Sequence, residues 1–265
     1  MTFHSLSTAL WAPSDTEPPL VGLEARIFRE FLIVLAAGEL RPGAGLCEHD
    51  VADIYGITPD RVGHVFQAMQ RVGLLSCSPT TGAQVETIAP EDAPGIIERA
   101  RTVTRYIVER LATAGLDHVG RETLARHIGQ QRMAEASGDW PRTNVLSVQF
   151  LALLARVDLR HDGFPGFDRQ AMRLMLLRAS YDRYGEPAPS ASTQSLLLNL
   201  IVERRTDEAV RVTDALYDGI VQRLWLDGTA EADLRTLLAR SQRAERAPDR
   251  AALRLVAVDG RRLDD

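Results

Sequence analysis

Apolar side chains recur with helical spacing in the first third of the chain. Between residues 24 and 37, five of them fall on one helical face: Ile27, Phe28, Phe31, Leu32 and Leu35. The stretch from 48 to 55 repeats this pattern over two turns, which directs Val51 and Ile54 inward, and Gly56 ends it. The pattern therefore predicts two amphipathic helices separated by a turn at residues 38–43.

A third helix is predicted from residue 59 to 72, followed by a hairpin. Thr58 is a suitable N-cap residue, and Pro59 occupies the first helical position, where its missing N–H removes no hydrogen bond. Leu74-Leu75 and Gln84-Val85 read as two short strands joined by a turn at 78–82. The order helix, helix, tight turn, helix, hairpin predicts a winged helix-turn-helix.

The rest of the chain has an almost wholly helical pattern, interrupted at 115, 137–141, 162–166 and 185–190, with a further amphipathic helix expected at 230–246. The predicted fold class is mostly α: an N-terminal winged helix-turn-helix followed by an all-α helical bundle. The predicted boundaries are a flexible tail at 1–21, the winged helix at 22–88, a proline-rich and acidic linker at 89–95, the helical domain at 96–228, and a C-terminal helix and tail at 229–265.

Composition narrows the function classes. No apolar run approaches the roughly 18 residues of a membrane span, and no basic stretch precedes an apolar one near the N-terminus, so a cytoplasmic protein is expected. The two cysteines, Cys47 and Cys77, cannot build a disulfide framework. Nucleophile-elbow, dinucleotide-binding and phosphate-loop motifs are missing, so we expect no enzyme and no cofactor.

Six short segments resemble the winged-helix domain of GntR-type bacterial regulators: Ile27-Phe-Arg-Glu-Phe31, Gly38-Glu-Leu-Arg-Pro-Gly43, Leu46-Cys-Glu-His-Asp-Val-Ala52, Tyr55-Gly-Ile-Thr58, Gly73-Leu74 and Gly82-Ala-Gln-Val85. The helical remainder, which opens with Glu98-Arg-Ala-Arg101, is similar to the sensing domain of the FadR-like (FCD) branch. The resemblance implies a homodimer that binds palindromic operator DNA and responds to a small-molecule effector, for example a carboxylate.

The segment matching the family's recognition helix departs from its pattern. Members of the family carry Ser-Arg-x-Pro-Val-Arg there, whereas this chain has Thr58-Pro-Asp-Arg-Val-Gly63, so both arginine positions are lost. Across residues 23–88, five arginines stand against eight acidic residues, and DNA-binding modules usually present a basic face. The expected DNA contacts reduce to a small set: Arg29, Thr58, Arg61, His64 and Arg71.

The resemblance also implies a metal site in many members, made by an aspartate, a histidine four residues later and two further histidines. The matching positions here hold Ser147, Leu151, Ser195 and Tyr217, and none of the six histidines lies in the later helices. We therefore expect no metal. The expected effector-binding residues are Arg101, Tyr106, Ser147, Ser195 and Tyr217.

Simpler roles stay open for these residues. For Arg101 the simpler role is a surface or intradomain ion pair with Glu98 or Glu109. The apolar cluster of Phe150, Leu151, Leu153 and Leu154 is more typical of a core than of an acyl-binding pocket. His118 and His127 are expected on solvated helix faces. Two hypotheses for the whole chain remain: an effector-responsive regulator, and a diverged relative that binds a ligand or a protein but no DNA. The missing arginines favour the second, and fold analogy favours the first.

Overall fold

The computed structural model describes residues 20–78, 80–157, 166–182 and 190–226. Most of the predicted N-terminal tail and the helix expected at 230–246 lie outside the described residues, as do most of the expected breaks at 162–166 and 185–190. Within the described residues, every helix is too short or too polar to cross a bilayer.

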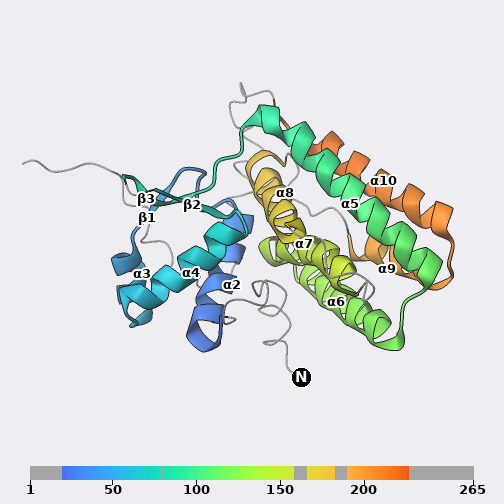
Figure 1. Cartoon of the computed structure of the whole chain (residues 1–265), viewed down its shortest axis with the longest axis horizontal. Helices are drawn as coiled ribbons and strands as arrows, with labels where there is room; N and C mark the ends of the chain where they lie inside the picture. Colours follow the sequence, from blue (N-terminus) through green and yellow to red (C-terminus); the bar gives the residue numbers. More distant parts are fainter. Residues whose placement is uncertain (1–19, 79, 158–165, 183–189, 227–265) are drawn as a thin grey trace, which may run out of the picture.

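The N-terminal part is the predicted winged helix (Figure 1). It contains α2 (Gly22–Ala36), β1 (Gly45–Leu46), α3 (Glu48–Tyr55), α4 (Pro59–Arg71), β2 (Leu75–Ser78) and β3 (Gly82–Val85). β3 pairs antiparallel with both neighbours, giving the strand order β1-β3-β2. The sequence pattern missed β1 because two residues are too few to show an alternation.

The apolar face of α4 packs as the spacing predicts: Val62, Val65, Phe66 and Met69 are at most 1% exposed. Phe66 meets Phe31 of α2 edge to face, with ring centroids 6.0 Å apart. The predicted inward position of Ile54 is wrong, because its side chain is 37% exposed. α3 is only two turns long and buries Val51 and Ala52 alone, so Ile54 lies at the margin of the contact.

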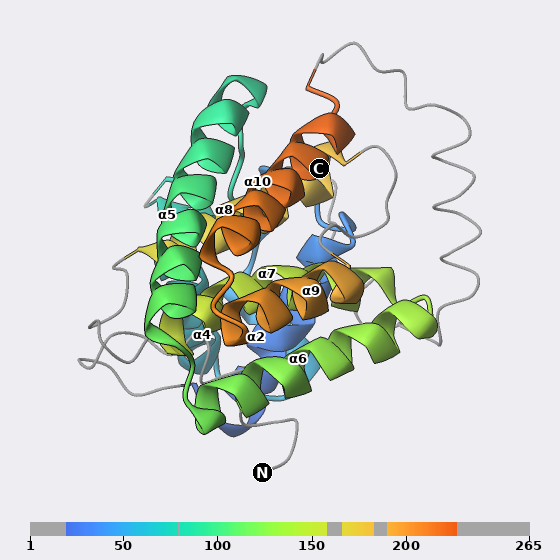
Figure 2. The same cartoon turned by 90° about the vertical axis from the view of Figure 1, so that its right-hand side faces the viewer.

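The C-terminal part is a bundle of six helices within the described residues: α5 (Ala93–Ala114), α6 (His118–Ala136), α7 (Trp140–Val157), α8 (Phe167–Tyr181), α9 (Ala191–Val202) and α10 (Thr206–Arg223). Figure 2 shows α5 and α10 side by side on one side of the bundle, and α6 beside α7 and α9. The segment predicted as a linker contains the short 3-10 helix η1 (Pro90–Asp92) and the first residues of α5.

The two parts share one hydrophobic core, which runs from Ile27 of α2 to Ile220 of α10. α2 forms the junction because it packs on α4 within the winged helix and on α7 and α8 of the bundle (Figure 1). Asn144 of α7 adds a polar link, with its Nδ2 donating to the carbonyl of Ala36 at 3.3 Å. The last turn of α2 is thus held by the bundle.

Candidate nucleic-acid interface and buried polar centre

The expected DNA-contacting residues of the α4 region lie on its outer face. Thr58, Arg61, His64 and Arg71 are all exposed, whereas Arg29 on α2 is half-buried. Thr58 precedes the helix in an extended conformation, and its carbonyl accepts the amides of Arg61 and Val62. Its side chain makes no capping hydrogen bond, so the predicted N-cap has the right backbone position without the hydroxyl contact.

Arg61 pairs with an acid of its own domain. Its Nε donates to Oε1 of Glu24, in the first turn of α2, at 2.9 Å. The arginine side chain is 47% exposed and the glutamate side chain 15%, so the carboxylate lies beneath the guanidinium. The arginine that α4 would present to a phosphate is therefore already compensated within the domain.

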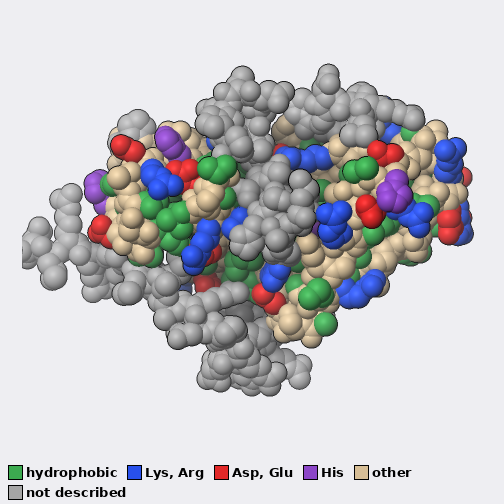
Figure 3. Space-filling model, turned by 90° about the horizontal axis from the view of Figure 1, so that it is seen from below, with side chains coloured by type: hydrophobic (Ala, Val, Ile, Leu, Met, Phe, Trp, Pro, Cys, Tyr) green, Lys and Arg blue, Asp and Glu red, His purple; other side chains and the backbone are tan. Residues whose placement is uncertain are grey.

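An acidic side chain also lies beside each of the two positions, Pro59 and Gly63, at which the family pattern has an arginine. Asp60 lies in the first turn of α4, where the helix dipole would otherwise favour a phosphate. A Cβ at Gly63 would lie 3.5 Å from Oε1 of Glu48 on α3. Figure 3 shows basic side chains interspersed with acidic ones on the face in view, with no single positive patch. Positive charge is therefore not concentrated on this face.

The expected effector residues on α5 and α10 form two surface pairs and one buried contact. The Nη2 of Arg101 donates to Asp218 at 2.7 Å, and its Nε lies 3.8 Å from Glu98. Arg101 therefore already has acidic partners within the bundle, as in the simpler role. Tyr106 is 45% exposed, with the Arg110 guanidinium 5.6 Å from its ring centroid.

Tyr217 is fully buried, and its hydroxyl shares a 2.8 Å hydrogen bond with Thr104. Burial raises the pKa of this phenol well above its ordinary value, while the bond to Thr104 and the charge of Arg101 act in the opposite direction. The Arg101 guanidinium lies 5.9 Å from the Tyr217 ring centroid. This phenol is therefore a neutral hydrogen-bonding group inside the bundle.

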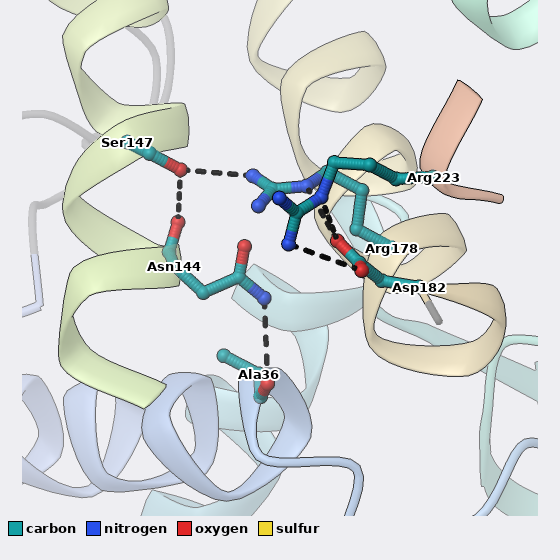
Figure 4. Close-up of polar contacts among 6 residues, drawn as sticks. All are labelled: Ala36, Asn144, Ser147, Arg178, Asp182 and Arg223. Carbon is teal, nitrogen blue, oxygen red and sulfur yellow. Dashed lines mark hydrogen bonds and ion pairs between the residues drawn. The ribbon is translucent and has the colours of Figure 1, made fainter. Parts of the chain in front are cut away.

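Ser147 of α7 belongs to a different polar group, shown in Figure 4. Its hydroxyl donates to the carbonyl of Asn144 at 2.8 Å and accepts from Nη1 of Arg178 on α8 at 3.0 Å. Arg178 is 3% exposed, and Asn144 is 9% exposed. We call Asn144, Ser147, Arg178, Asp182 and Arg223 the buried polar centre. The sequence analysis missed Arg178, although a lone arginine after the apolar run Leu174–Leu177 is a detectable signal.

Ser195 lies elsewhere again. Its hydroxyl donates to the carbonyl of Ala191 and accepts from Arg132 of α6 at 3.0 Å, and the residue is only half-buried. The inward position of α9 is the preceding residue, Gln194, which is fully buried and donates to Gln131 at 2.9 Å. The expected effector residues thus lie in three separate places: along α5 and α10, between α7 and α8, and between α9 and α6.

Within the described ranges, the structure contains no group of three or more His, Cys, Asp or Glu side chains arranged to hold a metal ion.

The predicted solvation of His127 is wrong: the side chain is 6% exposed, and its Nε2 donates to the carbonyl of Leu146 at 2.8 Å. The ring also lies nearly parallel to that of Phe150, with centroids 6.4 Å apart.

Solved structures share this architecture. A GntR transcriptional regulator from Rhodococcus sp. RHA1 matches with a TM-score of 0.58 and 19% identity, over 80% of this chain and 100% of that chain. McbR/YncC from E. coli matches with a TM-score of 0.56 and 17% identity, over 77% of this chain and 97% of that one. No protein-family model and no curated protein matches the sequence. The predicted fold, a winged helix-turn-helix followed by a helical domain, is confirmed.

Proposed function

We propose that the protein is a GntR-like transcriptional regulator, and not an enzyme, that binds operator DNA as a homodimer and responds to a small carboxylate effector. The observation that carries the proposal is the outer face of α4. This helix is packed in the winged-helix arrangement, with Arg61, His64 and Arg71 exposed along it. In such a dimer, two copies of α4 enter successive major grooves about 34–36 Å apart.

Effector control follows from the junction between the two parts. Because α2 contacts α4 on one side and α7 and α8 on the other, a change of packing in the bundle can reach the recognition helix through α2. A ligand that binds one packing more tightly shifts the population of that packing, and with it the spacing of the two winged helices.

Fluorescence anisotropy with intergenic DNA fragments flanking the gene, across a salt series, tests this function. We expect weak, saturable binding whose log–log salt slope is shallow, since each neutralised phosphate contributes only about −0.9. Light scattering should give twice the chain mass of 29.3 kDa. A monomer at micromolar concentration, or no binding to any fragment at low salt, would contradict the proposal.

The ion pair between Arg61 and Glu24 favours a second candidate, a relative that binds a ligand or a protein partner without DNA. The acidic surplus of the winged helix points the same way. Absence of DNA binding together with specific ligand binding would select this candidate.

A further inference from the structure

A pocket of about 310 Å³ lies between the turn that joins α5 to α6 and the turn that joins α9 to α10. Figures 1 and 2 show these two turns beside each other, at the end of the bundle far from the winged helix. The volume is at the small end of the range typical of ligand pockets, about 300–1,000 Å³. The pocket walls include two arginines, Arg121 of α6 and Arg204 of the second turn, and two apolar side chains, Leu116 and Val202.

Arg204 has a backbone conformation that is unusual for its residue type. Among the described residues it is the one non-glycine residue with a positive φ, 57°. Its amide donates to the carbonyl of Ile201 just after the end of α9, at a position where glycine is usual. An arginine in the left-handed region indicates that the side chain has a role at this place. The guanidinium lies against Gly115, with Nη2 3.0 Å from the position that a Cβ would occupy.

The charges of both arginines are uncompensated within the part of the chain that the structure describes. The acids next to Arg204, Glu203 and Glu208, pair with the neighbouring Arg205 at 3.1 and 2.5 Å. Among the described residues, no side chain forms an ion pair or a hydrogen bond with Arg121 or Arg204. Two guanidinium groups with free N–H donors therefore line one pocket.

The other charged groups at the pocket leave this positive balance in place. Asp117 also lines the pocket, but its Oδ1 accepts the amide of Gly120 at 2.7 Å and so caps α6. Nδ1 of His118 lies 3.8 Å from Glu122, and both of these side chains are well exposed. One capping carboxylate thus stands against two guanidinium groups, whose planar sets of N–H donors match the oxygens of a phosphate.

We propose that this pocket binds a small phosphate monoester. Its phosphate oxygens accept hydrogen bonds from Arg121 and Arg204, and its carbon body contacts Leu116 and Val202. A phosphate group carries between one and two negative charges at neutral pH, so it matches two guanidinium groups better than a singly charged carboxylate does. The pocket has room for more than the phosphate, because its volume is about ten times the share of one water molecule in the liquid.

Three small probes test the ligand chemistry on the full-length protein without DNA. They are glycerol 3-phosphate, inorganic phosphate, which lacks the carbon body, and glycerate, which carries a carboxylate on a three-carbon body. Ionic strength is held constant, because salt screens exposed charges. Amide chemical shifts of Gly115, His118 and Arg204 follow each titration and give the Kd. We expect glycerol 3-phosphate to bind about tenfold more tightly than either of the other probes.

Each of the other outcomes contradicts a separate part of the proposal. Equal affinity for inorganic phosphate would assign the pocket to the free ion and overturn the ester. Equal affinity for glycerate would show that the pocket does not select a phosphate group. The absence of saturable shifts at these amides with any probe would overturn the site itself.

Arg204→Gly separates ligand binding from a structural role of the arginine. Glycine suits the left-handed backbone, so the melting temperature should be unchanged or higher. The Kd for glycerol 3-phosphate should nevertheless rise about tenfold, because one guanidinium is lost. In the structural alternative, the guanidinium serves only to cap the C-terminal end of α5, where the helix dipole favours a cation. The melting temperature would then fall while the Kd stayed the same, and this result would overturn the proposal.

Arg121→Gln removes the second cation and should also raise the Kd about tenfold. Arg126→Gln is the matched control, because Arg126 is an exposed arginine of the same helix that does not line the pocket. It should leave the Kd unchanged. Equal weakening by the two variants would mean that only net charge attracts the ligand, and would overturn the site. Because these titrations contain no DNA, failure of DNA binding contradicts the proposed function alone.

Discussion

Nε of Arg61 donates to Oε1 of Glu24 across 2.9 Å, and this contact joins the first turn of α4 to the first turn of α2. An exposed pair of this kind contributes about 0–1 kcal/mol. A DNA phosphate can therefore displace the carboxylate, at the cost of breaking the pair. In the proposed regulator, the contact would weaken DNA binding without preventing it.

Removing the carboxylate should consequently strengthen DNA binding. We expect Glu24→Gln to lower the Kd for DNA severalfold and to make the salt slope steeper by up to about one phosphate per subunit. Arg61→Ala should raise the Kd. Anisotropy across a salt series measures both. Glu39→Gln is the control, because it removes the same charge from an exposed turn of the same domain; an equal gain from that variant would mean that only net charge matters.

Restoring an arginine at position 63 should also strengthen binding, but less than the family pattern alone implies. A side chain there begins 3.5 Å from Oε1 of Glu48, which would pair with the new guanidinium. We therefore expect Gly63→Arg to bind DNA more tightly than the wild type, and Gly63→Arg with Glu48→Gln more tightly still. Replacing a helical glycine should also add roughly 0.5–1 kcal/mol to stability. Equal DNA affinity of the single and double variants would show that Glu48 has no effect on it.

Periodicity predicted α2, α3 and α4 and the helical pattern of the bundle because these elements bury apolar faces at regular spacing. It did not predict which polar side chains are buried. His127 is carried on a helix of weak amphipathicity, so its face could be assigned only from the packing of α7 against α6. On α9, Gln194 rather than Ser195 points inward, a difference of one residue that alignment to a family pattern does not fix.

The buried polar centre could not be derived from spacing at all. Asn144 and Arg178 lie on different helices, and their meeting depends on the packing of α7 against α8. The partner of Asn144, the carbonyl of Ala36, is a backbone atom that no sequence motif marks. The resemblance predicts Ser147 as an effector residue, and the structure shows that its hydroxyl contacts Asn144 and Arg178.

Metal removal should have no effect on stability. The positions at which the resemblance implies metal ligands carry Ser147, Leu151, Ser195 and Tyr217, and Tyr217 is hydrogen-bonded to Thr104. We expect the melting temperature to be the same with and without a chelator, and less than one equivalent of zinc or nickel per chain by elemental analysis. A chelator-sensitive melting temperature, restored by zinc, would contradict this expectation.

Acidification should destabilise the fold through His127. Burial lowers the pKa of this imidazole below its ordinary value of 6.5, while the hydrogen bond to the Leu146 carbonyl raises it to a smaller extent. Between the lowered folded value and 6.5, the unfolded chain binds a proton that the folded chain does not. The free energy of unfolding therefore falls as pH decreases through this window, by at most about 1.4 kcal/mol per pH unit.

Urea denaturation between pH 7.5 and 5 measures this slope. His127→Gln should flatten it, because the amide can still donate to the Leu146 carbonyl and does not titrate. His118→Gln is the matched control, because His118 lies on the same helix with its side chain 84% exposed, so this change removes a histidine from α6 without touching the buried contact to Leu146. If the slope persists in His127→Gln, the acid sensitivity belongs to groups other than the His127 imidazole.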